Sequence, residues 1–327
     1  MATRRRLLLT LGSAAAVAPA WVRGQPTPRP LRLGWVSLSA SFDEPYNLAF
    51  VERLAELGFV EGRNLAIERR HVAGALDKLP EVAAELGRLN CDAYFGGGSE
   101  ATLGALAQAS RDAPIVFIAV DFDPVVTGDV TDLARPGGRL TGMTALQASL
   151  PAKRLELLRE LLPRMRKVAV FTNEQTSAQL ALARGTARRL GLALHVVDFR
   201  RPPFDYPAGF ADAIQAKADA VFVLGSGLFV PGRRVIPELA LKARLPTVFH
   251  QAQWVEAGGL MSYGFSFARM WRRGAEMMAK VLSGTPAGTI PMEQPTVYEL
   301  ALNAKTARTL GIEIPKSIQV RADRMIG

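Results

Sequence analysis

The stretch CDAYFGGGSEATLGALAQA, residues 91–109, joins an apolar run to a segment with helical spacing through three glycines and Ser99. An apolar run that ends in a tight glycine turn is typical of a buried strand, and the residues after it repeat at helical intervals. We therefore expect a strand, a turn and a helix here. This is the unit from which parallel α/β sheets are built.

The same unit recurs on both sides of this stretch. The expected strands before residue 150 span 31–37, 64–70, 91–97 and 113–120, and the expected helices span 44–57, 76–89, 99–110 and 124–134. A turn and a further strand are expected in PGGRLTGMT, residues 136–144. The rhythm restarts with strands at 166–173, 192–198, 218–226 and 245–250 and helices at 151–162, 176–190, 207–217 and 232–243. Later elements are expected at 258–264, 266–282, 296–303 and 304–310. Two such runs predict an α/β fold of two doubly wound parallel-sheet lobes, with the chain crossing between them more than once.

The first 24 residues are predicted to be an export signal. Arg4, Arg5 and Arg6 precede the apolar run LLLTLGSAAAVAPA, residues 7–20, which ends in a small-x-small cleavage pattern. TRRRLLL also resembles the twin-arginine motif. Cleavage near residues 20–24 would lower the formal charge from +10 to +6. The alternative is a basic N-terminus that leads into a core helix.

A single cysteine, Cys91, excludes an intrachain disulfide and leaves no cysteine after the signal to carry a lipid. Its place before an apolar strand predicts a buried thiol. The mature chain is expected in the periplasm without a lipid anchor. The remaining lysines and arginines are scattered along helices, which argues against nucleic-acid binding.

The sequence lacks the motifs of nucleotide-binding, metal-binding and hydrolase sites. GGGSEAT has no Lys-Ser/Thr pair and fits the dinucleotide pattern poorly, so we expect no nucleotide and no other cofactor. His71, His195 and His250 are isolated, so no metal site is expected. No G-x-S-x-G elbow is present, and we assign no catalytic residue.

Small polar and aromatic residues follow the expected strands, where parallel sheets bind ligands outside their carboxyl ends. The candidate ligand contacts are Ser39, Phe42, Gly98, Ser99, Asp121, Phe122, Asn173, Ser226 and Tyr263. A helix N-terminus at Ser99 suits a carboxylate. The alternatives remain open: Ser99 only caps its helix, Asp123 caps the next one, and the aromatic residues are core.

Several longer segments resemble the exported substrate-binding proteins of ABC transporters related to the tryptophan/tyrosine-binding group. The resemblance runs from about residue 31 to the end. Its most specific stretches are DFDPVVTGDVTDLARPGGRLTGMT (121–144), KRLELLRELLPRMRKVAVFTN (153–173), ADAVFVL (218–224), WVEAGGLMSYG (254–264) and MEQPTVYELALNAKTARTLGIEIPKSIQVRADRMI (292–326).

The resemblance implies the type I periplasmic binding-protein fold, with a hinge and a ligand cleft between the lobes. The implied first lobe spans 31–163 and 264–291, and the second spans 164–263 and 292–327. Cleft contacts carry over to Ser99, Asn173 and Ser226, and Asp121 is a candidate for holding an ammonium group.

The implied ligand is an amino acid or another small aromatic or aliphatic carboxylate. A monomer would deliver it to an ABC permease in the inner membrane, powered by a separate cytoplasmic ATPase. A ligand-sensing module for a membrane receptor is the main alternative, and an enzyme is a weaker one.

Overall fold

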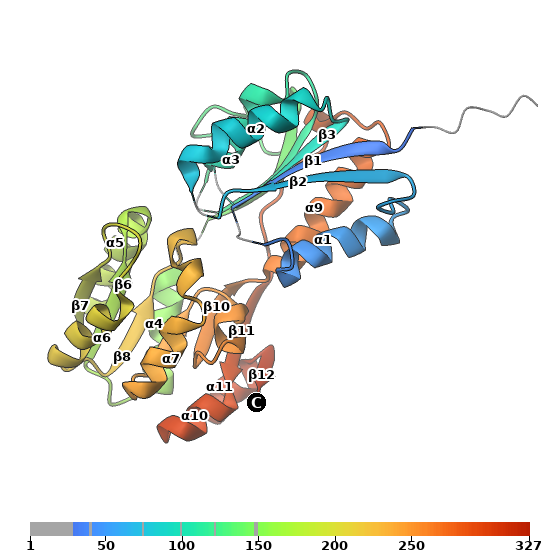
Figure 1. The fold of residues 1–327 in the computed structure, drawn as a ribbon. Helices are drawn as coiled ribbons and strands as arrows, with labels where there is room; N and C mark the ends of the chain where they lie inside the picture. Colours follow the sequence, from blue (N-terminus) through green and yellow to red (C-terminus); the bar gives the residue numbers. More distant parts are fainter. Residues whose placement is uncertain (1–28, 39–40, 74, 99, 121, 147–149) are drawn as a thin grey trace, which may run out of the picture.

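The computed structural model describes residues 29–38, 41–73, 75–98, 100–120, 122–146 and 150–327. These residues form two α/β lobes, each with its own central sheet (Figure 1). The two-lobed α/β prediction is confirmed. The proposed export signal lies outside the described residues.

The first lobe is built on a parallel sheet with strand order β2-β1-β3-β4-β5. Its strands are β1 (Leu31–Ser37), β2 (Leu65–His71), β3 (Ala93–Gly98), β4 (Ile115–Val120) and β5 (Leu140–Ala145). Its helices are α1 (Pro45–Glu56), α2 (Leu79–Arg88, preceded by the 3-10 turn η1, Leu76–Lys78), α3 (Glu100–Ala109) and α9 (Phe267–Leu282).

Two helix layers cover the two faces of this sheet (Figure 1). Helices α1 and α9 pack together on one face, and α2 and α3 pack together on the other. Side chains alternate along each strand. Phe95 therefore joins the core under α1 and α9, whereas its neighbour Tyr94 joins the core under α2 and α3.

The second lobe has the strand order β12-β11-β10-β9-β8-β6-β7, parallel except for the antiparallel pair β10–β11. Its strands are β6 (Lys167–Thr172), β7 (Ala193–Asp198), β8 (Ala220–Val223), β9 (Thr247–Phe249), β10 (Met261–Phe265), β11 (Tyr298–Asn303) and β12 (Arg324–Ile326). Its helices are α4 (Leu150–Leu161), α5 (Ser177–Arg189), α6 (Tyr206–Gln215), α7 (Val235–Lys242), α8 (Ala252–Glu256), α10 (Ala304–Leu310) and α11 (Lys316–Arg321).

Three short 3-10 turns complete the described elements: η2 (Glu174–Thr176), η3 (Gly227–Gly232) and η4 (Ala287–Thr289). Turns η2 and η3 follow the carboxyl ends of β6 and β8. They therefore occupy the positions at which a ligand is expected to meet a parallel sheet.

The chain crosses between the lobes at three places: between β5 and α4, from β10 into α9, and between η4 and β11. Strand β10 contributes side chains to the cores of both lobes: Met261 packs in the second core and Phe265 packs in the first.

Helix α4 packs on α5 and β10 of the second lobe, whereas the sequence analysis assigned residues up to 163 to the first. The buried leucines of α4, such as Leu155 and Leu158, belong to the second core. Leu150, the first residue of α4, still packs in the first core. We propose that the boundary between the lobes lies at the start of α4, between Leu150 and Leu155.

The helix predicted over 124–134 is wrong, because the described structure there consists of turns and bends. The Asp123 carboxylate accepts hydrogen bonds from the backbone N–H groups of Val125 and Val126, at 3.0 and 3.3 Å. Gly128 then takes a φ of +82°, which ends any helical continuation. An Asp before a Pro is common both at helix N-caps and in Asx turns. The sequence alone therefore did not distinguish a helix from a turn at this position. Helices α8 and α11 and strand β12 were not predicted.

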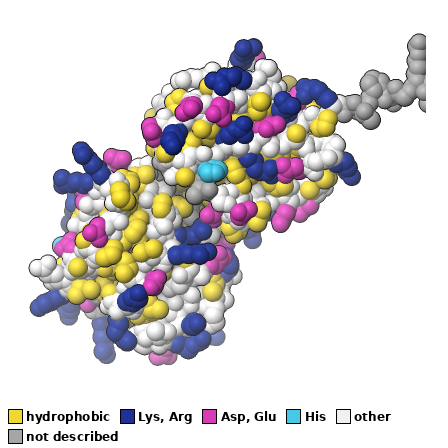
Figure 2. All heavy atoms as spheres, viewed as in Figure 1, with side chains coloured by type: hydrophobic (Ala, Val, Ile, Leu, Met, Phe, Trp, Pro, Cys, Tyr) yellow, Lys and Arg dark blue, Asp and Glu magenta, His cyan; other side chains and the backbone are white. Residues whose placement is uncertain are grey.

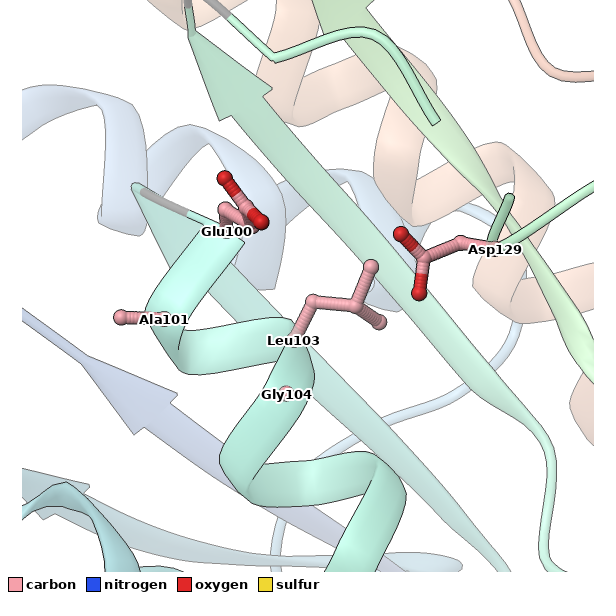
Figure 3. A pocket seen from close by; sticks show the side chains of 5 residues that line it. All are labelled: Glu100, Ala101, Leu103, Gly104 and Asp129. Carbon is pink, nitrogen blue, oxygen red and sulfur yellow. The ribbon is translucent and has the colours of Figure 1, made fainter. Parts of the chain in front are cut away.

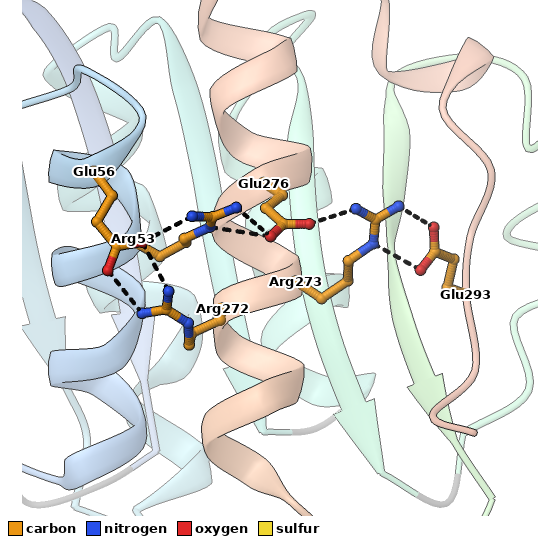
Figure 4. Close-up of polar contacts among 6 residues, drawn as sticks. All are labelled: Arg53, Glu56, Arg272, Arg273, Glu276 and Glu293. Atoms are coloured by element: carbon orange, nitrogen blue, oxygen red, sulfur yellow. Dashed lines mark hydrogen bonds and ion pairs between the residues drawn. The ribbon is translucent and has the colours of Figure 1, made fainter. Parts of the chain in front are cut away.

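An ionic network fastens α9 to its neighbours in the first lobe (Figure 4). Glu276 on α9 accepts from Arg53 on α1 at 2.8 Å and from Arg273 at 2.5 Å. Arg273 also pairs at 2.5 Å with Glu293, which lies where the chain leaves the first lobe. The network therefore anchors one end of a crossover segment.

Candidate functional site

The carboxyl ends of the two sheets lead into segments that meet between the lobes. Arg233, which follows β8 and η3, lies 2.7 Å from the carboxylate of Glu44, which follows β1. We call the residues just beyond β1, β3 and β4 in the first lobe, and just beyond β6, β8 and β9 in the second, the facing edges.

Four candidate residues belong to the glycine turn and the neighbouring strand ends of the first lobe. Ser39, Ser99 and Asp121 lie outside the described residues. Gly98 is the last residue of β3 and pairs with Ala119 of β4. The candidate position at Gly98 is therefore at the facing edge.

The two aromatic candidates of the first lobe differ in exposure. The half-buried ring of Phe42 lies 5.0 Å from Trp35, and the Arg69 guanidinium lies 5.9 Å from the Phe42 centroid. Phe122 is 3% exposed, and its ring packs 5.9 Å from Phe117 in the core beneath α2 and α3. This burial favours the core alternative for Phe122.

Asn173 lies directly after β6 and is 4% exposed. Its Oδ1 accepts a hydrogen bond from the backbone N–H of Gln175 at 3.0 Å, which caps η2. Thr176 completes a reciprocal capping box by accepting from the Asn173 backbone N–H. The Asn173 Nδ2 has no hydrogen-bond partner among the described residues. A buried donor without a partner is costly, so this amide is suited to an incoming acceptor.

Ser226 follows β8 and is held by its neighbours. Its hydroxyl donates to Gln175 Oε1 at 2.8 Å and accepts from the backbone N–H of Leu228 at 3.1 Å, which caps η3. Gln179 fixes the preceding residue through a reciprocal pair with the Gly225 backbone, at 2.8 and 3.0 Å. These contacts tie η2 and η3 into one rigid edge of the second lobe. A glutamine inside the apolar stripe of α5 is the sequence signal that could have identified Gln179.

Tyr263 lies on the crossing strand β10 and packs against the cores of both lobes. Its ring stacks on Tyr298 of β11 at 5.8 Å, and burial raises the pKa of its hydroxyl. Its carbonyl accepts from Arg154 Nε at 2.7 Å. Tyr263 therefore links residues beside all three crossovers.

His250, which follows β9, was not selected from the sequence. It is 4% exposed, and its Nδ1 has no hydrogen-bond partner among the described residues. Burial, and to a lesser degree the nearby Arg154 charge, lowers the pKa of the imidazole to about 3. The ring is therefore neutral at physiological pH. Both Arg154 and His250 lie at the hinge, where long-range contacts rather than local pattern bring them together.

A surface pocket of about 330 Å³ lies beside the first turn of α3, next to the glycine turn (Figure 3). Glu100 and Asp129 extend their carboxylates toward it from α3 and from the loop after β4. Two acids here disfavour the carboxylate that the helix N-terminus alone would suit, and they favour a cationic group.

The described residues include no group of three or more metal-ligating side chains. In that same part of the chain, no helix has the length and apolar character needed to cross a membrane. On the face seen in Figure 2, lysines and arginines are interspersed with acids and do not gather in a stripe. Cys91 is buried as predicted, and burial raises the pKa of its thiol to about 11.

The family model described as ABC transporter substrate binding protein matches residues 41–326. A tyrosine-binding protein from Clostridioides difficile (strain R20291) is 23% identical over 267 residues, which cover 81% of this chain and 76% of that protein.

Two solved structures share the fold. A conserved domain protein from Vibrio cholerae is 25% identical with a TM-score of 0.77, covering 91% of this chain and 100% of that one. An ABC domain from Streptococcus pneumonia, solved in complex with L-Trp, is 22% identical with a TM-score of 0.76 and the same coverage.

Proposed function

Because this chain belongs to the family of ABC transporter substrate-binding proteins, we propose that it is exported to the periplasm, captures an amino acid between its lobes and delivers it to an ABC permease. The family consists of binding proteins, so the prediction that the chain is not an enzyme is confirmed. A relative that binds tyrosine and a structure with bound L-Trp support an aromatic amino acid as the ligand.

The buried Asn173 amide is the observation that carries this proposal. Its oxygen is engaged in the η2 cap, so only its N–H groups are available to a ligand, and they suit a carboxylate. In the first lobe, the pocket acids Glu100 and Asp129 favour the ammonium group of the same ligand. The two lobes would thus recognise opposite ends of a zwitterion.

Capture needs no bond to be made or broken. Ligand held by one lobe gains contacts from the other when the lobes approach, and this differential affinity raises the closed population. The contacts kept from the sequence analysis are Ser39, Phe42, Gly98, Ser99, Asp121, Asn173, Ser226 and Tyr263. The pocket acids Glu100 and Asp129 are added to them. Phe122 is left out because its ring is buried in the core.

Isothermal titration calorimetry of the mature protein with L-tyrosine and L-tryptophan tests the ligand class. We expect one ligand per chain. Asn173→Asp keeps the oxygen that caps η2 but replaces the donor with a negative charge. It should weaken binding roughly tenfold or more, since a hydrogen bond to a charged group contributes about 1.5–3 kcal/mol.

The matched control is Asn173→Ser, which also supplies a capping oxygen but adds no charge and should lose less affinity. Melting temperatures of both variants establish that they fold. If no amino acid binds, or if Asn173→Asp binds as tightly as the parent protein, the proposed ligand class is wrong.

A further inference from the structure

One ion pair joins the two lobes directly. Arg233 Nη1 and Glu44 Oε2 are 2.7 Å apart, although the residues are 189 positions apart in the sequence. Among the ion pairs formed by the described residues, it is the one whose partners belong to different lobes. The side chains are only 26% and 14% exposed, so water screens this pair less than a surface contact.

The Glu44 end is held in place by its own helix. The Glu44 carbonyl accepts from the backbone N–H groups of Asn47 and Leu48, at 2.8 and 3.1 Å. The buried Asn47 side chain in turn reaches the Ser41 carbonyl at 3.4 Å. Glu44 occupies the N-cap position of α1, but its carboxylate makes no cap hydrogen bond and instead reaches Arg233.

The Arg233 end is positioned by turn η3. Its backbone N–H donates to the Val230 carbonyl at 3.0 Å. The preceding Gly232 packs so closely on Tyr206 that a Cβ at this position would lie 2.5 Å from the tyrosine Cζ. Ser226, one of the proposed ligand contacts, caps the first residues of the same turn. The turn therefore connects a proposed ligand contact to the ion pair.

We propose that Glu44 and Arg233 form an inter-lobe latch, which favours the arrangement with the facing edges together and so raises ligand affinity; this role rests on the proposed function. The pair exists only while the segments after β1 and β8 are in contact, and swinging the lobes apart must break it. Its contribution enters the equilibrium between open and closed lobes directly.

The latch is tested first without ligand, by measuring the distance between spin labels on the two lobes. Glu52→Cys on α1 and Ala181→Cys on α5 are exposed label sites, and the native Cys91 is buried with a raised thiol pKa. Arg233→Gln and Glu44→Gln should each shift the distance distribution toward wider separation. The charge-swapped pair Glu44→Arg with Arg233→Glu should restore it.

Arg234→Gln is the matched control, because the neighbouring arginine is exposed and should leave the distribution unchanged. A distribution that is unchanged in both single variants, or a swap that restores nothing, would overturn the latch.

Titration with L-tyrosine and L-tryptophan then measures the effect on binding. Arg233→Gln should weaken affinity about fivefold, with Arg234→Gln unchanged. Unchanged or tighter binding by Arg233→Gln contradicts the latch. If neither amino acid binds the parent protein, the proposed ligand fails, while the label distances still decide the latch.

Discussion

His250 shows how a single buried side chain can make stability depend on pH. Burial, with a smaller contribution from Arg154, lowers its pKa in the folded chain to about 3, whereas an unfolded histidine titrates near about 6.5. Between these values the unfolded chain binds a proton that the folded chain does not. Stability should therefore fall as the pH falls through this range.

We expect His250 to remove about 2 kcal/mol from the free energy of unfolding between about pH 7 and about pH 5. His250→Gln, which carries no titratable group, should flatten the pH dependence by about that amount in urea unfolding. His71→Gln is the control, because it makes the same substitution at an exposed position. Equal slopes in the parent protein and His250→Gln would contradict this assignment.

At the scale of the element, strand β10 depends on close backbone packing as it leaves the second lobe. A Cβ on Gly264 would lie 2.0 Å from the His250 carbonyl oxygen, which is backbone and not easily moved. The strand pairs with β9 on one side and β11 on the other, so it has little freedom to shift. Position 264 therefore requires glycine, because no side chain fits beside the His250 carbonyl.

Gly264→Ala should therefore destabilise the protein by about 3 kcal/mol, the upper range for overpacking. Gly185→Ala is a matched control, since Gly185 lies in α5 and a Cβ there meets nothing within 4 Å. Because glycine is unfavourable inside a helix, Gly185→Ala should raise the free energy of unfolding by about 0.5–1 kcal/mol. Thermal and urea unfolding measure both, and a neutral Gly264→Ala would refute the close contact.

At the scale of the whole molecule, the crossovers are joined to one another as well as to the lobes. Arg154, which is fully buried near the start of α4, donates to the Tyr263 carbonyl on β10. The ring of Tyr263 stacks on Tyr298, which begins β11 after the third crossover and also lies 5.3 Å from Phe265. Bending at one crossover must therefore be accommodated at the others.

Tyr298→Ala removes this stack and should broaden the distribution of inter-lobe distances in the ligand-free protein. Tyr298→Phe keeps the aromatic ring and should behave like the parent protein. The same pair of spin labels, on α1 and α5, provides the measurement. A distribution as narrow in Tyr298→Ala as in the parent would show that the stack does not couple the crossovers.

The sequence by itself determined the alternation of strands and helices, and with it the two parallel-sheet lobes, because apolar periodicity and glycine turns are local signals. It also predicted that Asn173 and Ser226 lie at the ends of buried strands: Asn173 directly follows β6, and Ser226 comes three residues after β8. Local pattern was insufficient at 124–134, where Asp123 and Pro124 start a turn instead of a helix.

Only the tertiary structure decided which lobe α4 joins, that Phe122 faces the core, and which distant side chains meet at the hinge. Glu44 and Arg233 carry no mark in the sequence, because their pairing depends on how the strand ends of two separate sheets come together. The same holds for His250, whose burial beside the charge of Arg154 keeps its imidazole neutral. Contact and burial across the lobes are properties of the packed molecule, and no short stretch of sequence contains them.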